Sequence, residues 1–142
     1  MIKKASAIWR GGFKEGGGTI STETGALNEA PYGYKARFES GAKGTNPEEL
    51  IGAAHAGCFS MALSLMLGEA GLTAESIETH AAVTLEKVGD GFTITSSHLD
   101  VVAKIPNADQ AKFAAIADKA KAGCPVSKVL NAVITMNAKL VT

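Results

Sequence analysis

Residues 46–69 read NPEELIGAAHAGCFSMALSLMLGE, a long stretch that is almost free of charge after its first turn. Asn46 is a good N-cap, Pro47 suits the first helical position, and Glu49 stands three residues past the cap, as in a capping box. Gly68 and Gly71 bracket the far end, where a helix commonly terminates. The stretch therefore predicts one helix that begins at Pro47 and ends between the two glycines.

Residues 50–67 of this helix form a run of eighteen residues without a formal charge, close to the length of a membrane span. The run nevertheless contains His55, two glycines and two serines; Glu49 stands directly before it, and Glu69 stands two residues after it. A buried helix of a globular protein fits these features better, so we expect no membrane partner.

The same helix is apolar on nearly all sides, and one small sheet could not cover it. An exchange of elements with a second copy of the chain would bury the remaining surface. On this ground we predict a homodimer.

The rest of the chain alternates strand and helix patterns. Short alternating runs predict strands at 5–9, 18–22 and 34–38, and longer ones predict a hairpin of 78–88 and 91–105 around Gly89-Asp90-Gly91. Residues 109–121 predict an amphipathic helix, Pro125 opens a short one, and 133–141 alternates as a last strand. We expect a single α+β domain over 1–142, with the order β-β-β-α-β-β-α-α-β and antiparallel sheets packed around a buried central helix.

Charge and the N-terminal sequence limit the partners and the compartment. Fourteen basic residues balance fourteen acidic ones, so no net field would attract nucleic acid, and we expect no nucleic-acid partner. The first ten residues lack the apolar run and the cleavage site of a signal peptide. We therefore expect a cytoplasmic protein whose two cysteines are reduced unless they take part in redox chemistry.

Cys58 and Cys124 have different local settings. Cys124 precedes Pro125, where the unpaired N–H groups of the following helix favour a thiolate. Cys58 lies in the middle of the long helix and would need a nearby cation, because a free thiol is only about 3% ionised at pH 7. The alternative is that both are inert core residues, since free cysteine is often buried.

Metal and cofactor sites have little support in the sequence. The chain has no Cys-x-x-Cys or His-x-x-x-His pair, and His55, His80 and His98 stand alone. We expect no metal and no bound cofactor. Taken by themselves, Glu48 suits dipole compensation at the start of the long helix and Arg37 suits a solvated strand.

The run from Lys43 to Ala62, KGTNPEELIGAAHAGCFSMA, strongly resembles the OsmC branch of the OsmC and Ohr family. The resemblance extends to GEAG at 68–71, AKAGCPVS at 120–127 and PYGY at 31–34, and so spans nearly the whole chain. It implies an intertwined α+β homodimer with two active sites at its interface, which reduces organic hydroperoxides in preference to hydrogen peroxide.

The resemblance also assigns roles to individual residues. Cys58 matches the peroxidatic cysteine and Cys124 the resolving cysteine. Glu48 matches the active-site glutamate, and Arg37 matches the arginine of the OsmC branch, although Arg10-Gly11-Gly12 partly resembles the segment that supplies the arginine in the Ohr branch. Arg37 is the preferred candidate, and Arg10 remains the alternative.

These residue roles, together with the known effects of charge on thiol ionisation, predict a mechanism. A guanidinium within about 4 to 6 Å can lower a thiol pKa by about 1 to 3 units, and Glu48 can orient Arg37 by paired hydrogen bonds. Ten residues of helix span about 15 Å, so Glu48 cannot reach Cys58 of its own chain and is expected to come from the partner subunit. The Cys58 thiolate is expected to attack the outer peroxide oxygen, and the resulting sulfenic acid to condense with Cys124 to a disulfide, which an external dithiol reduces. The similarity to the Ohr branch suggests a lipoyl group as this dithiol.

Two other functions remain open at this point. A redox sensor would form the same disulfide and pass it to a partner, and a stress protein without enzymatic activity would hold both thiols inert in the core.

Overall fold

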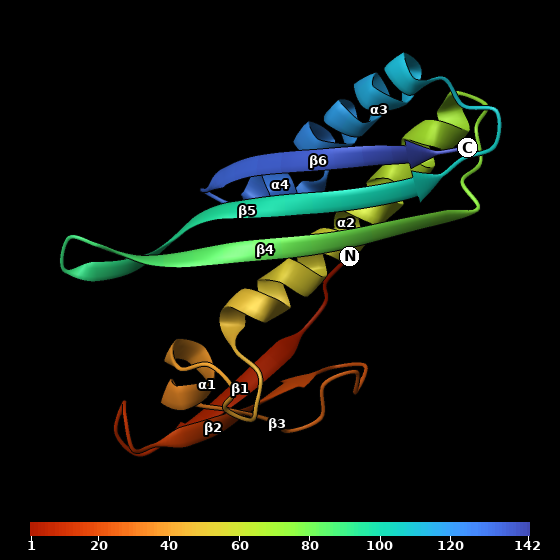
Figure 1. Ribbon diagram of the computed structural model, residues 1–142. Helices are drawn as coiled ribbons and strands as arrows, with labels where there is room; N and C mark the ends of the chain where they lie inside the picture. Colours follow the sequence, from red (N-terminus) through yellow and green to blue (C-terminus); the bar gives the residue numbers. More distant parts are fainter. The chain divides into compact units, whose positions relative to one another are not determined.

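The computed structural model describes residues 1–142 and contains two compact units, Met1–Leu50 and Ile51–Thr142. The first unit holds the antiparallel sheet β1 (Ala5–Arg10), β2 (Gly17–Thr22) and β3 (Ala30–Tyr32), in that spatial order (Figure 1). Ala7 pairs with Ile20, and Ile20 pairs in turn with Ala30. The two strands predicted at 5–9 and 18–22 are confirmed.

The predicted strand at 34–38 is wrong, because Tyr34–Phe38 forms the short helix α1. Tyr34, Ala36 and Phe38 fit an alternating pattern, but a helix also places Tyr34 and Phe38 on one side, since they are four residues apart. Their ring centroids lie 4.9 Å apart, and both rings also contact Phe13, at 5.3 and 6.1 Å. Aromatic packing thus selects the helix over the strand, and the third strand lies earlier, at Ala30–Tyr32.

Helix α2 (Pro47–Glu69) forms where the sequence predicted it. The Asn46 Oδ1 atom accepts a hydrogen bond from the Glu49 backbone N–H at 2.8 Å, which confirms the N-cap. At the other end Gly71 has φ +75°, a left-handed conformation that stops the helix. The cap and this glycine explain why the helix has these limits.

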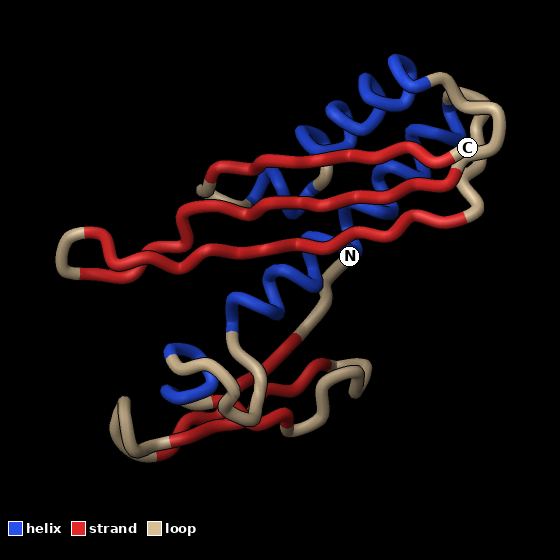
Figure 2. The backbone as a smooth tube through the Cα atoms, viewed as in Figure 1, coloured by secondary structure: helices blue, strands red, loops and turns tan.

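The second unit contains a sheet in the order β4-β5-β6, formed by β4 (Ser76–Val88), β5 (Gly91–Lys104) and β6 (Val133–Val141). Figure 2 shows β4 and β5 as two long strands joined by one tight turn, where Gly89 has φ +63°. The predicted hairpin is therefore confirmed. Strand β6 pairs with β5 in parallel, so the expectation of purely antiparallel sheets is wrong for this sheet.

The parallel pairing follows from the connection between β5 and β6. Helices α3 (Gln110–Gly123) and α4 (Pro125–Val129) lie between these strands in the chain. A crossover through helices returns the chain to the same end of the sheet, which makes the next strand parallel. Both helices match the predicted ones, and Asp109 Oδ2 caps α3 by accepting from the Lys112 N–H at 2.9 Å.

The core of the second unit lies between α2, α3 and one face of its sheet (Figure 1). Eleven apolar side chains are buried there: Phe59, Leu63, Leu67, Leu99, Val101, Ala103, Ile105, Phe113, Ala117, Ala120 and Cys124. By length and composition alone, α2 could cross a membrane. Its three buried large side chains make it a core helix of this unit instead.

Another face of α2 remains exposed. Met61 is 77% exposed and Leu65 is 65% exposed, and Gly57 lies on the same side, one turn before Met61. Large apolar side chains that lie together on an exposed helix face commonly mark an interaction surface.

Candidate active site

Both cysteines are free thiols and lie in the second unit. Cys58 is half-buried in the middle of α2, while Cys124 is fully buried at the junction between α3 and α4. The two thiols are close enough for each to influence the ionisation of the other. The structure therefore brings together two cysteines that are 66 positions apart in the sequence.

The surroundings of the two thiols favour different protonation states. Burial raises the pKa of Cys58, and its interaction with the Cys124 thiol raises this pKa further. Burial also acts to raise the pKa of Cys124, but Cys58 and the backbone N–H and side chain of Ser127 outweigh it, so this pKa is lowered. The Cys124 side chain makes no N-cap hydrogen bond to α4. The prediction that the helix start favours a Cys124 thiolate is confirmed in direction.

A buried polar network lies beside the cysteines. His55 is fully buried on α2, and its two ring nitrogens lie 2.7 Å from Ser97 Oγ on β5 and 2.7 Å from Ser127 Oγ on α4. Burial lowers the pKa of His55, which keeps the imidazole neutral near pH 7. All three side chains are satisfied, as buried polar groups in native proteins usually are.

Arg37 and Glu48 form an ion pair within the first unit. Arg37 Nε lies 3.1 Å from Glu48 Oε1 and 3.3 Å from Oε2, and Arg37 Nη2 lies 2.8 Å from Oε1. The Glu48 side chain is only 10% exposed, and that of Arg37 is 36% exposed. This two-pronged geometry suits guanidinium and orients its plane. Arg10, the alternative candidate, is exposed on β1 and forms no ion pair.

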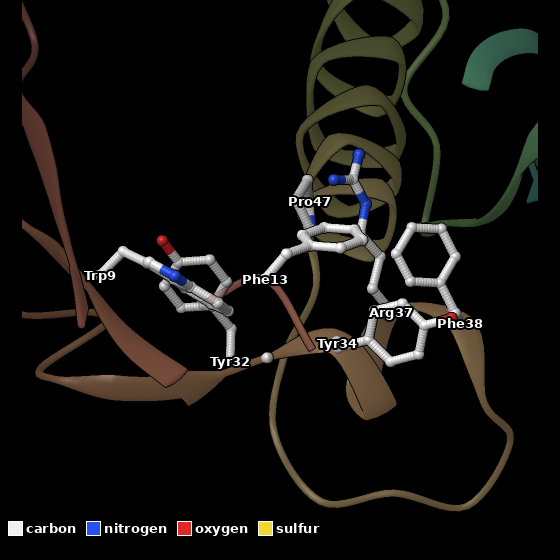
Figure 3. A pocket seen from close by; sticks show the side chains of 8 residues that line it. Trp9, Phe13, Tyr32, Tyr34, Arg37, Phe38 and Pro47 are labelled. Carbon is white, nitrogen blue, oxygen red and sulfur yellow. The ribbon is translucent and has the colours of Figure 1, made fainter. Parts of the chain in front are cut away.

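A cavity of about 170 Å³ opens beside Arg37. Figure 3 shows aromatic rings around this cavity, with the guanidinium next to Pro47 at the start of α2. The rings belong to Trp9, Phe13, Tyr32, Tyr34 and Phe38. Lys14 stacks over Tyr34 at 5.9 Å, and Arg37 lies 5.5 Å from the Phe38 ring. The cavity thus combines an apolar wall with one oriented positive charge.

Comparison with known proteins identifies the family. Residues 40–139 match the family model described as OsmC-like protein. The chain belongs to the OsmC-like family. It is 60% identical to the peroxiredoxin OsmC of Escherichia coli strain K12 over 138 residues, which cover 97% of this chain and 96% of the relative.

Solved structures of related proteins agree with this membership. The organic hydroperoxide resistance protein OhrB of Bacillus subtilis superposes with a TM-score of 0.71 at 27% identity, covering 96% of this chain and 98% of the other. An OsmC-like protein from Mycoplasma pneumoniae, at 19% identity, shares the fold with a TM-score of 0.76 over 100% and 99% of the two chains. The predicted OsmC and Ohr relationship and the α+β fold are confirmed, and the relatives support peroxidase activity.

In this OsmC-like protein the sequence pointed to two pairs of side chains, and each pair is in contact. Cys58 and Cys124 interact in the second unit, and Arg37 binds Glu48 in the first. The hydrogen-bond network of His55 was not predicted from the sequence. The one available signal was spacing, because His55 stands three residues before Cys58 and Ser127 three residues after Cys124.

Proposed function

We propose that this protein reduces organic hydroperoxides to alcohols, with Cys58 as the peroxidatic cysteine and Cys124 as the resolving cysteine. The proposal rests on one observation: these two free thiols interact with each other, in a chain that is 60% identical to a peroxiredoxin. Both compact units would act together as one OsmC-like domain, 1–142.

The first step needs a thiolate on Cys58. The thiolate attacks the outer peroxide oxygen, the O–O bond breaks, and an alkoxide leaves and takes a proton to become the alcohol. The sulfur of Cys58 becomes a sulfenic acid. Since burial raises the pKa of Cys58, a cation must favour its ionised form, and the oriented Arg37 supplies that charge.

We infer that this arginine and its carboxylate reach Cys58 across a dimer interface. Glu48 and Cys58 stand ten residues apart on α2, which separates them by about 15 Å of helix. The Glu48 of the partner subunit would therefore accompany Cys58. The exposed apolar face of α2, with Met61 and Leu65, supports a homodimer.

The substrate would place its organic part in the aromatic cavity. The rings of Phe13, Tyr34 and Phe38 contact one another and offer an apolar surface next to Arg37. Hydrogen peroxide has no apolar part to place there, so the cavity favours organic hydroperoxides. An organic hydroperoxide with an aryl or alkyl group of moderate size fits this volume.

The cycle closes when a dithiol reduces the Cys58–Cys124 disulfide by thiol exchange, and we propose a lipoyl group for this reductant. A cytoplasmic location would keep the two thiols reduced between turnovers. Neither metal nor cofactor is needed for these steps. A redox sensor would use the same disulfide, but it would not turn over repeatedly with a dithiol.

The deciding experiment measures intact mass. The reduced protein and a Cys124→Ser variant are each treated with an equimolar amount of organic hydroperoxide. The parent should lose two hydrogens as the disulfide forms, and the variant should carry a trappable sulfenic acid on Cys58. Unchanged masses in both proteins would mean that the thiols are inert and that the proposal is wrong.

The role of Arg37 has a matched control on the same helix. Arg37→Gln should slow the oxidation of Cys58 by about tenfold or more, because one unit of thiol pKa changes the thiolate fraction about tenfold. Lys35→Gln removes an equal charge from an exposed position of α1 that lacks the carboxylate partner. Equal rates for the two variants would exclude Arg37 as the activating group, and the same assay on Arg10→Gln would test the alternative.

A further inference from the structure

His55 is a buried ionisable side chain for which the proposed peroxide chemistry has no use. It is 0% exposed, and it is the one buried histidine, carboxylate or amine of the second unit. An apolar side chain would fill this place at lower cost, since a buried polar group must keep all of its hydrogen bonds. His55 stands three residues before Cys58 on α2, which places it about one helical turn from the thiol pair.

The hydrogen bonds of His55 determine its tautomer. A neutral imidazole has one N–H donor and one acceptor, so one serine must donate to it and the other must accept. Ser97 is fully buried, and His55 Nδ1 at 2.7 Å is its side-chain partner. The Ser97 hydroxyl hydrogen therefore goes to Nδ1, and the proton of the ring is assigned to Nε2.

The assignment continues to Ser127. With the proton on Nε2, the ring donates to Ser127 Oγ at 2.7 Å. The hydroxyl hydrogen of Ser127 is then free to point at another acceptor. Ser127 stands in the first turn of α4, three residues after the capping residue Cys124, and its hydroxyl helps to lower the pKa of the Cys124 thiol. The chain of donors runs from Ser97 through His55 to Ser127, and it ties α2, which carries Cys58, to the start of α4 beside Cys124.

We propose that His55 and Ser127 are positioning residues for Cys124: His55 holds Ser127, and Ser127 directs its hydroxyl at the Cys124 sulfur, which attacks Cys58. This inference rests on the proposed function, because the step that these two residues assist is the formation of the Cys58–Cys124 disulfide. In that step the Cys124 thiolate attacks the sulfur of the Cys58 sulfenic acid, an S–S bond forms, and the S–O bond breaks. The leaving hydroxide takes up the proton that Cys124 released on ionising and becomes water, while Cys124 is oxidised and Cys58 is reduced.

Few other titratable groups face this network. Cys58 comes from α2, β5 contributes Ser97, and α4 contributes Ser127. From α3, the backbone carbonyl of Ala120 accepts a hydrogen bond from the Cys124 N–H. The lysines of α3 and α4, Lys121 and Lys128, are not among the buried residues. A change in the ionisation of Cys124 on removal of the Ser127 hydroxyl therefore reports on the network.

The test measures the ultraviolet absorbance of the thiolate as a function of pH, in the reduced Cys58→Ser protein, where Cys124 is the only thiol. Ser127→Ala should move the midpoint upward by about one pH unit, a tenfold lower thiolate fraction, because one hydrogen bond to the charged sulfur is lost. Ser127→Thr keeps the hydroxyl and should restore the midpoint. Ser60→Ala removes a hydroxyl bonded to Thr79 on β4 and should leave it unchanged.

A second pair of variants keeps the proposal falsifiable if Ser127→Ala does not fold. His55→Gln retains an N–H that can reach Ser127, whereas His55→Met has similar volume and no donor. The midpoint should rise in His55→Met and stay close to the parent value in His55→Gln. Equal midpoints in all folded variants, or an equal shift in Ser60→Ala, would overturn the proposal. The titration uses no peroxide, so its result stands apart from the fate of the peroxidase proposal.

Discussion

A drop in pH should destabilise this protein through His55. The side chain is fully buried, both ring nitrogens are engaged with serine hydroxyls, and burial lowers its pKa. In the unfolded chain the same imidazole takes up a proton near its ordinary pKa of 6.5. Below that pH the unfolded state binds a proton that the folded state does not, so the free energy of unfolding must fall.

The size of the effect follows from linkage. If the folded His55 stays neutral, moving from about pH 7.5 to about pH 5.5 removes about 1.4 kcal/mol of stability, which is an upper limit for one group. This contribution of His55 to the free energy of unfolding is fully present above the pKa that His55 has in the unfolded chain. It is lost as the pH falls toward the lower pKa that His55 has in the folded protein. Denaturant unfolding of the reduced protein at fixed protein concentration measures this change directly.

Two variants isolate the contribution of His55. His55→Gln should lower the free energy of unfolding at both pH values. The difference between the two values should become smaller than in the parent by about 1 kcal/mol or more, because the variant has no imidazole to protonate. His80→Gln alters an exposed histidine, whose side chain is 73% exposed, and should keep the full difference. If His55→Gln shows the same pH dependence as the parent, His55 is not buried in the neutral form and the assignment of its proton to Nε2 is wrong.

Three further predictions address the substrate, the dimer and the first sheet. Tyr34→Leu should lower kcat/KM for an aryl hydroperoxide by about three- to tenfold and leave that for hydrogen peroxide nearly unchanged, because only the ring contacts are lost; equal losses in steady-state assays would contradict the aromatic cavity as the substrate site. Leu65→Asp should shift the protein toward monomer in sedimentation, whereas Val88→Asp, on a residue 55% exposed at the β4–β5 turn, should not. Gly18→Ala should cost about 2 kcal/mol or more in thermal unfolding, since its Cβ would lie 2.2 Å from the Ile8 carbonyl oxygen, while Gly91→Ala meets no atom within 4 Å and should be nearly neutral.

Much of the fold could be predicted because its signals are local. The Asn46 cap, the Gly89 turn and the glycine that ends α2 each act on neighbouring backbone atoms, and the structure has all three. Where two local patterns competed, the sequence was ambiguous. Residues 34–38 fit both a strand and a helix, and contact with the distant Phe13 favoured the helix. The parallel register of β6 likewise depends on how α3 and α4 pack, which no short pattern encodes.

Part of the candidate site could likewise be predicted from the sequence, and part could not. Residue types and short motifs were enough to predict the two cysteines, the arginine, the glutamate and the family. Only the tertiary structure joined His55 to Ser97 and Ser127, which stand 42 and 72 positions away in the chain. In the sequence these are an isolated histidine and two ordinary serines. Packing of α2 against β5 and α4 turns them into one hydrogen-bonded network, since burial leaves each polar group no water to bond with.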